Sequence, residues 1–151
     1  MPDESDDRLD SVGAWAKKYT LTSRALIESV LREHDLGPTQ WYVLHQLVNV
    51  GPTMQRDLSV LLRIERATLS GVVATLVRKG LVLQTPDPVD QRQRRLSITD
   101  AGRRLWSELP DPVAAVHAIS FDGVDEAELA IARAVLRRAT QRLVDHLGAA
   151  D

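Results

Sequence analysis

Apolar residues recur at three- and four-residue steps along the first part of the chain, which is the spacing of one face of an amphipathic helix. The residues on this stripe are Val12, Ala16, Tyr19, Ser23, Leu26 and Val30. We therefore predict a first helix from near Leu9 to near His34, about 38 Å long at the usual rise per residue. A helix of this length overshoots a compact three-helix unit, so we expect it to need a partner.

Three shorter helices are predicted next. Gly37-Pro38 starts the second helix, because proline is tolerated at the first helical position, and Gly51-Pro52 ends it. Thr53 is expected to cap a short third helix. A turn at residues 63–65 leads to a fourth helix with Gly80 just after its end, so that the two form a helix-turn-helix candidate. Their core candidates are Trp41, Leu44, Leu47, Val48, Leu58, Leu61, Leu69, Val72, Val73 and Leu76.

After Gly80 the pattern changes from helical to strand-like. The segments LVLQ (81–84) and RLSI (95–98) read as short strands joined by a long polar hairpin loop. Thr99 should cap a fifth helix, which Pro110 and Pro112 break or kink near Leu109.

The last helix should start at Asp125, which has Glu128 three residues later in a capping pattern. Its apolar positions form a narrow seam of the kind found between helices, often between subunits. The seam consists of Leu129, Ala132, Leu136, Ala139, Leu143 and Leu147. The whole order predicts a mainly α fold with a small β-wing (α+β), of about six helices and one β-hairpin.

Composition adds a charge asymmetry that the net charge of −2 conceals. Residues 56–104 hold ten Lys and Arg against five Asp and Glu, whereas residues 1–37 hold five against eight. Residues 105–151 hold four against eight. A basic middle between acidic flanks suggests a surface for a polyanion, and a solvated charged face is the alternative that charge alone leaves open.

Several classes of function are disfavoured by the residues that the chain lacks. Without cysteine there are no disulfides, thiol metal sites or cysteine redox sensors. The histidines have no paired metal-ligand spacing, and there is no glycine-rich phosphate loop or convincing Ser/His/Asp set, so we expect no metal, cofactor or catalytic residues. No apolar run is long enough for a bilayer. The acidic, polar start is no signal peptide and should fray, so we expect a cytoplasmic protein.

The predicted hairpin carries the most specific motif. Asp90-x-Arg92, followed by Leu96-x-Ile98-Thr99-x-x-Gly102, resembles the D-x-R…L-T-x-x-G signature of the MarR family of bacterial transcriptional regulators. The segment LVRKGLV (76–82) resembles the end of that family's recognition helix, and the resemblance extends over nearly the whole chain.

The resemblance implies one domain over 1–151, a winged helix-turn-helix embedded in a helical dimerisation frame. Residues 8–36 and 103–148 would be the dimerisation helices, and 38–102 the DNA-binding lobe with its wing at 81–98. The implied function is a homodimeric, non-enzymatic repressor of a pseudo-palindromic double-stranded operator, released by a small aromatic or anionic effector.

Physical chemistry independently favours DNA for the basic middle. A helix with a polar face fits the major groove, and a narrow minor groove attracts an arginine on a slender loop. We expect Arg92 to enter the minor groove, with a solvated loop arginine as the alternative, and Asp90 to hold the loop by accepting hydrogen bonds. The predicted DNA-binding residues are Arg56, Arg66, Thr68, Ser70, Thr75, Asp90, Arg92, Arg94 and Arg95.

The kind of contact stays open for several of these residues. Arg66 and Thr68 are predicted to contact either bases or phosphates, and Arg94 and Arg95 either phosphates or nearby acids. Arg56 would clamp a phosphate or form a surface ion pair. Two positions depart from the family. Gly71 stands where relatives carry a long groove residue, and Glu65 is a weak cap where serine or aspartate is usual.

Candidate effector contacts are Trp15, Tyr19, Trp41 and His45, near the expected junction of the dimerisation helices and the DNA-binding lobe. Trp41 also lies on the apolar stripe of its helix, where a tryptophan is more often a core residue than a ligand contact, and His45 is equally a structural histidine. The alternative function is a winged-helix protein–protein interaction module without sequence-specific DNA binding. The wing arginines argue against this alternative, and an enzyme is the third option.

Overall fold

The computed structural model describes residues 8–149, so the expected fraying of the first residues falls mostly outside the described part. The chain divides into two compact units, the first ending at Val113 and the second starting at Ala114. Within the described residues, no helix is both long enough and apolar enough to cross a membrane.

The first long helix is α2 (Val12–Leu31), which the side chain of Ser11 caps by accepting the N–H of Ala14 at 3.1 Å. The turn η1 (Arg32–His34) is a 3-10 helix, so the predicted first helix tightens in its last turn. Asp35 then adopts a left-handed conformation with φ of 54° and redirects the chain toward α3 (Pro38–Asn49). Pro38 occupies the first position of α3, as predicted.

Thr53 does not cap the next helix, and this expectation was wrong. Thr53–Met54 form strand β1, which pairs with Leu96 and Arg95 of a later strand. Helix α4 (Gln55–Leu62) therefore starts one residue later than a Thr53 cap would place it, with Met54 at the N-cap and no side-chain cap there. Thr53 joins a strand because a distant segment of the chain supplies its pairing partner. Local capping preferences cannot reveal such a partner.

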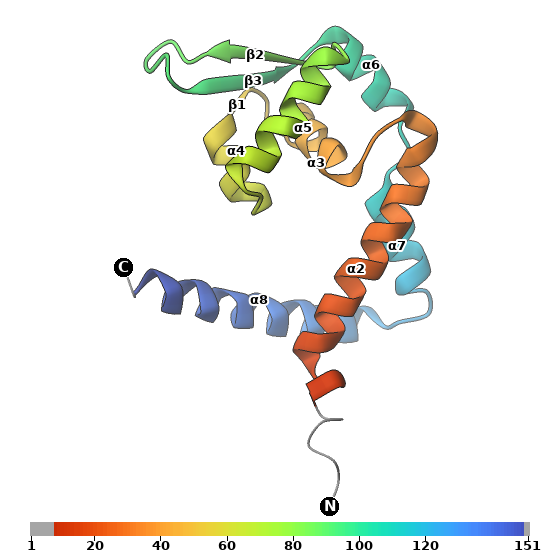
Figure 1. The fold of residues 1–151 in the computed structure, drawn as a ribbon. Coiled ribbons are helices and arrows are strands. Elements are labelled where there is room, and N and C mark those ends of the chain that lie inside the picture. Colours follow the sequence, from red (N-terminus) through yellow and green to blue (C-terminus); the bar gives the residue numbers. More distant parts are fainter. Residues whose placement is uncertain (1–7, 150–151) are drawn as a thin grey trace, which may run out of the picture. The chain divides into compact units, whose positions relative to one another are not determined.

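Helices α4 and α5 (Arg66–Arg78) form the predicted helix-turn-helix (Figure 1). The turn between them starts at Arg63, which has a left-handed φ of 52°, and Gly80 follows α5 with a φ of 74°. Leu58, Leu69, Val73 and Leu76 are buried as expected, whereas Leu61 is 60% exposed. Of the two leucines predicted for the buried side of α4, only Leu58 is therefore in the core.

Strands β2 (Val82–Pro86) and β3 (Arg94–Ile98) pair antiparallel and form the wing, a hairpin that projects from the lobe (Figure 1). The register runs from Val82 opposite Ile98 to Pro86 opposite Arg94, so the loop is shorter than the sequence suggested. The sheet has three strands in the order β1-β3-β2, one more than predicted. The predicted mainly α fold with a β-wing is otherwise confirmed.

Helix α6 (Asp100–Glu108) starts against the base of the wing. Thr99 accepts the N–H of Gly102 at 3.0 Å, and its own backbone N–H donates to the carbonyl of Leu81 at 3.1 Å. A Cβ atom on Gly102 would lie only 2.3 Å from that carbonyl oxygen. The Thr-x-x-Gly part of the wing motif is therefore the capped start of α6, and its last position has room only for glycine.

The core of the first unit surrounds α3, which packs against α2, α5, α6 and β3. Val43, Leu44, Leu47 and Leu96 are fully or almost fully buried there. This packing fixes the helix-turn-helix and the base of the wing on one framework.

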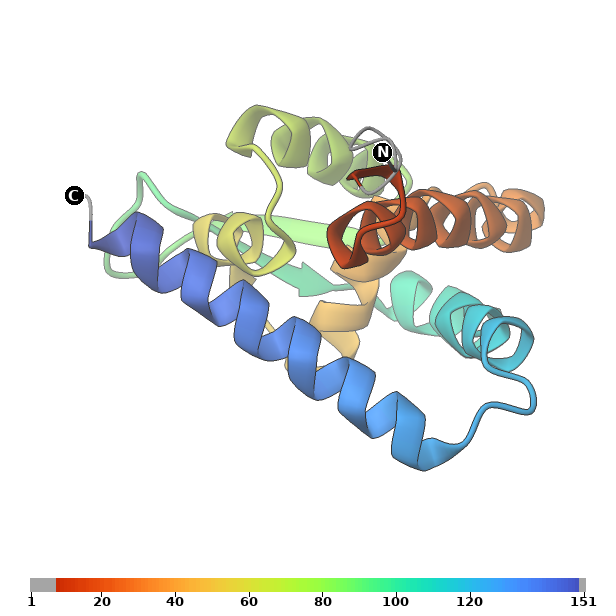
Figure 2. The same cartoon turned by 90° about the horizontal axis from the view of Figure 1, so that it is seen from below.

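Helix α6 ends before Leu109 and Pro110, as predicted, and α7 (Pro112–Ser120) begins at the boundary between the units. The second unit also contains α8 (Glu126–Gly148), an unbroken helix that Asp125 caps through the N–H of Ala127 (Figure 2). None of the described residues of α8 is buried. Leu143 and Leu147 of the predicted seam are 65% and 68% exposed, so this apolar face is uncovered in the single chain.

Candidate nucleic-acid interface

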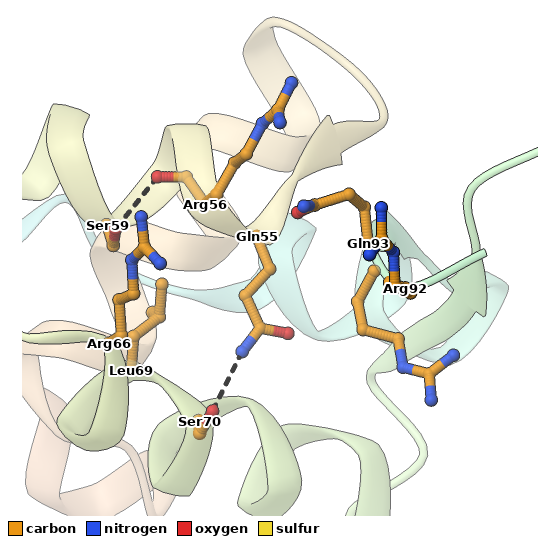
Figure 3. Close-up of a pocket in the computed structure, with 9 residues that line it drawn as sticks. Gln55, Arg56, Ser59, Arg66, Leu69, Ser70, Arg92 and Gln93 are labelled. Carbon is orange, nitrogen blue, oxygen red and sulfur yellow. Dashed lines mark hydrogen bonds between the residues drawn. The ribbon is translucent and has the colours of Figure 1, made fainter. Parts of the chain in front are cut away.

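A cavity of about 190 Å³ lies between α4, the first turns of α5 and the wing (Figure 3). Among the described residues that line it, none is acidic. Its lining consists of Gln55, Arg56, Ser59, Arg66, Leu69, Ser70, Arg92, Gln93 and Arg94. Five of the predicted DNA-binding residues, which come from three different elements, are thus brought to one place.

Two arginines of this cavity form weak, exposed ion pairs with neighbouring aspartates. The Nε atom of Arg56 lies 3.6 Å from Asp57 Oδ1, and that of Arg92 lies 3.4 Å from Asp90 Oδ1. Both pairs are solvent-exposed, the Arg92 side chain by 91%, and exposed pairs of this kind contribute little free energy. The surface ion pair that was the alternative for Arg56 is therefore present. It is too weak to prevent the guanidinium from binding a phosphate.

A chain of side-chain hydrogen bonds joins the wing to α4 and α5. Gln84 of β2 donates to Gln55 Oε1 at 2.7 Å, and Gln55 Nε2 donates to the Ser70 hydroxyl of α5 at 3.1 Å. In Figure 3, Gln55 stands between Arg66 on one side and Arg92 and Gln93 on the other. Gln55 was not predicted from the sequence, because its partners lie far along the chain and no local pattern marks them.

Two aspartates shape the loop of the wing. Asp87 Oδ2 accepts the backbone N–H groups of Val89 and Asp90 at 3.1 and 3.0 Å. Asp90 Oδ1 accepts the backbone N–H of Arg92 at 3.1 Å and its Nε at 3.4 Å. Asp90 thus makes the hydrogen bonds expected of it. Asp87 was missed, although an aspartate followed by proline is a recognisable turn signal.

The remaining predicted DNA-binding residues lie outside the lining of this cavity. Thr68 is exposed on α5, and Arg95 is exposed on β3 opposite Met54 and Thr85. Thr75 is half-buried, donates to the carbonyl of Gly71 at 3.1 Å and lines a different cavity, of about 540 Å³.

The middle of the exposed side of α5 carries small residues at Ala67, Gly71 and Ala74. A Cβ atom on Gly71 would meet nothing within 4 Å, so this position has room for a larger side chain. At the start of α5, Glu65 occupies the N-cap position without a side-chain hydrogen bond, in agreement with the weak cap expected there.

An aromatic cluster elsewhere in the first unit contains two of the four predicted effector contacts. The Trp41 ring lies 5.1 Å from His45 and 5.4 Å from Trp106 between centroids. These three side chains line a cavity of about 270 Å³ together with Asn49, Leu109, Pro110 and Asp111. Trp41 is only 4% exposed, so it is both a core residue and a wall of the cavity.

Trp15 and Tyr19 are not part of this cavity's described lining. They lie on α2, where Trp15 is 55% exposed and donates from Nε1 to Asp10 Oδ1 at 2.6 Å. Trp106 was missed, because its sequence position gives no sign that it meets Trp41. Among residues 8–149, no group of three His, Asp or Glu side chains is placed to hold a metal ion.

Comparison with known proteins gives consistent matches. A model described as the MarR family matches residues 34–93. A probable transcriptional regulator from Pseudomonas aeruginosa is 28% identical, with 86% of this chain and 97% of that chain covered and a TM-score of 0.74. BpsR of Bordetella bronchiseptica, whose DNA binding is regulated by 6-hydroxynicotinic acid, is 24% identical, with 87% and 94% covered and a TM-score of 0.77.

A cysteine-to-serine mutant of MarR from E. coli, in complex with operator DNA, has a similar fold. It is 19% identical to this chain, with 91% of this chain and 99% of that chain covered and a TM-score of 0.80.

Proposed function

We propose that this chain, which belongs to the MarR family of winged helix-turn-helix transcriptional regulators, represses transcription as a homodimer on a pseudo-palindromic operator and is released by a small effector. The observation that carries this proposal is the cavity where arginines of α4, α5 and the wing converge and whose described lining contains no acidic residue. Such a surface suits the phosphates of double-stranded DNA, and a regulator of this kind would act in the cytoplasm.

Helix α5 is the element that would enter the major groove. Arg66, Thr68 and Ser70 stand on its first turns, where recognition helices contact base edges, and Thr75 stands near its other end. The small side chains at Ala67, Gly71 and Ala74 allow the helix backbone to approach the bases closely. The long exposed polar side chains of α5 stand at its two ends, at Arg66 and Arg78, so base readout by long side chains would come from there.

The wing would enter the adjacent minor groove through Arg92. This side chain is 91% exposed on the loop, and Asp87 and Asp90 fix the backbone that carries it. A narrow minor groove concentrates negative potential, which favours an inserted guanidinium. Arg94 and Arg95 follow at the start of β3, where phosphates flank such a groove.

Dimerisation would cover the apolar face of α8. Leu136, Leu143 and Leu147 are between 42% and 68% exposed in the single chain, and soluble proteins rarely leave a long apolar stripe uncovered. A second copy of the same helix offers a matching seam. Two-fold symmetry of the dimer then requires an operator with two related half-sites.

The effector would bind in the cavity lined by Trp41, His45 and Trp106. Its aromatic walls and few polar groups have the character of a small-molecule site. The regulation of BpsR by 6-hydroxynicotinic acid supports a small aromatic acid as the class of ligand. Trp15 and Tyr19 would contribute only if the effector extends toward α2. A ligand that prefers the form unable to bind DNA lowers DNA affinity by linkage.

The distinguishing experiment compares DNA binding with the alternative, a protein–protein interaction module. Genomic fragments retained by the protein are titrated by fluorescence anisotropy against shuffled sequences at several salt concentrations. We expect tighter binding to retained fragments, and an affinity that falls about 10³- to 10⁵-fold between 50 and 200 mM salt if six to ten phosphates are contacted. Equal and weak binding to all sequences would favour the alternative.

A further inference from the structure

We propose that the cavity lined by Thr75, between the bend that joins α2 to α3 and the end of α5, binds a small dicarboxylate that competes with DNA for Arg78. One carboxylate would bind Arg32 of η1 and the other Arg78 of α5. The binding site goes beyond the proposed function, whereas the competition with DNA rests on it. In the described structure, the lining of this cavity shares no residue with the cavities proposed for DNA and for the aromatic effector.

The cavity has the size of a small-molecule site but a charged lining. Its volume is about 540 Å³, and pockets for small molecules span roughly 300–1,000 Å³. Three of its described lining residues are basic and two are acidic, and Leu36 is the only large apolar residue among them. A ligand that suits this lining is polar and charged, unlike the aromatic effector proposed for the cavity beside Trp41.

Two of the three basic residues lack an acidic partner. The Nζ atom of Lys79 lies 3.2 Å from Asp35 Oδ2 and also donates to the Asp35 carbonyl. The other acidic residue, Glu28, is paired at 3.4 Å with an arginine one helical turn earlier on α2. Among the described residues, no acidic side chain forms an ion pair with Arg32 or Arg78. The cavity therefore offers two guanidinium groups to an anionic ligand.

Two separate guanidinium groups favour a ligand with two separate anionic groups. A guanidinium binds one carboxylate through two parallel hydrogen bonds. Arg32 belongs to η1 and Arg78 to α5, so each can take one end of a short dicarboxylate. Gln40 of the same lining accepts the N–H of Gly37 through Oε1 at 3.4 Å, and its Nε2 group can donate to a carboxylate.

The pair of Lys79 and Asp35 holds the two sides of the cavity together before a ligand arrives. It joins the residue after α5 to the residue after η1, and the Lys79 side chain is only 26% exposed. A site whose walls are already positioned loses less conformational entropy when it binds. Arg78 and Lys79 also offset the negative end of the α5 dipole, which would otherwise disfavour an anion here.

A ligand bound to Arg78 would lower the affinity for DNA. Arg78 is one of the two long side chains of α5 from which base readout is proposed. A guanidinium that binds a carboxylate in the cavity is withdrawn from DNA, and the bound dianion adds negative charge beside α5, which repels phosphates. By linkage, DNA weakens the binding of the dicarboxylate by the same factor.

Calorimetry on the DNA-free protein tests the site. The probes are malonate, succinate, glutarate and adipate, with the monocarboxylate butyrate as the control ligand at the same ionic strength. We expect one dicarboxylate per chain, bound at least about tenfold more tightly than butyrate. Arg32→Gln and Arg78→Gln should each bind the dicarboxylate as weakly as butyrate. Arg103→Gln, which changes an exposed arginine of α6 outside the lining, should bind it like wild type.

Asp35→Asn tests the same site in the opposite direction. Asparagine tolerates the left-handed φ of 54° at this position, and the carbonyl that Lys79 contacts is kept. The substitution frees the charge of Lys79, so the dicarboxylate should bind about tenfold more tightly than to wild type. Glu108→Gln removes an exposed acid outside the lining and should bind like wild type. Equal binding to Asp35→Asn and wild type would overturn the site.

Anisotropy titrations of retained genomic fragments test the competition with DNA. The dicarboxylate that binds most tightly is added at saturating concentration, with the ionic strength held constant. The affinity of the wild-type protein for DNA should fall by about fivefold or more. DNA binding by Arg32→Gln should not respond to the dicarboxylate, because Arg32 is not among the proposed DNA contacts and its loss removes only the ligand site.

The proposal is overturned if no dicarboxylate binds more tightly than butyrate, or if Arg103→Gln weakens binding as much as the two lining variants. The second result would indicate a general attraction of anions. A bound dicarboxylate that leaves DNA affinity unchanged would also overturn it. In each case the protein would still prefer its retained fragments, so the proposed function would stand. Failure of the ligand-free protein to prefer any fragment would instead refute the proposed function, while calorimetry would still decide the site.

Discussion

Substitution of Gly102 by alanine tests why the wing motif ends in glycine. The added Cβ atom would lie 2.3 Å from the carbonyl oxygen of Leu81 and 2.7 Å from Ile98 Cγ1. The Ile98 side chain can turn away, but the Leu81 carbonyl is fixed by the N–H of Thr99 at 3.1 Å. Either the start of α6 or the base of the wing must therefore move.

The net effect follows from three opposing contributions. Alanine is favoured over glycine within a helix by about 1 kcal/mol. Overpacking in a closed site costs about 1–3 kcal/mol, and weakening the Thr99 hydrogen bond costs about 1 kcal/mol more. We therefore expect Gly102→Ala to lower the free energy of unfolding by about 1–3 kcal/mol. The matched control Gly71→Ala, in an exposed helix with open space, should raise it by about 0.5–1 kcal/mol.

Urea unfolding followed by circular dichroism measures both effects, at one fixed protein concentration because a dimer's stability depends on concentration. The midpoints of the two variants should move in opposite directions from wild type. A Gly102→Ala variant as stable as wild type would refute the assignment of this glycine to close packing. The assignment is supported if the two midpoints shift in opposite directions while the slope of the unfolding free energy against urea concentration stays unchanged.

Further predictions concern binding and assembly. Arg92→Ala should weaken operator binding by about 1–3 kcal/mol in anisotropy titrations while the protein stays folded. Unchanged affinity would show that Arg92 does not enter the minor groove. Asp90→Ala should weaken operator binding less directly, by loosening the loop of the wing. Leu136→Asp or Leu143→Asp should unfold or monomerise the protein in light scattering, whereas wild type that is a stable monomer at micromolar concentration would contradict the dimer. Trp41→Ala should abolish the binding of an aromatic acid identified by calorimetric screening, and binding that survives would place the effector elsewhere.

Local signals in the sequence were sufficient for most of the helical framework. Pro38 marked the start of α3, Thr99 the start of α6 and Asp125 the start of α8, because capping depends on neighbouring residues alone. Asp90 was placed in the wing for the same reason. Its hydrogen-bond donors both belong to Arg92, two residues away, so the D-x-R spacing contains the interaction.

Interactions between distant segments could not be predicted in this way. Thr53 looks like a helix cap, and only its pairing with Leu96 makes it a strand residue. Gln55 bridges Ser70 and Gln84, and Trp106 meets Trp41, although nothing near any of these residues marks the contact. The arginines of the candidate site were therefore predicted from the sequence. The hydrogen-bonded link from Gln84 through Gln55 to Ser70 could be identified only in the structure.

Selection from a pool of random double-stranded DNA tests most directly whether this protein reads an operator as a dimer. Bound sequences are recovered at physiological salt and sequenced over successive rounds. We predict enrichment of a pseudo-palindrome whose half-sites lie about one helical turn apart, ~34 Å, as two symmetry-related α5 helices require. Recovery of unenriched sequences, or of a single half-site without a symmetric partner, would contradict the account.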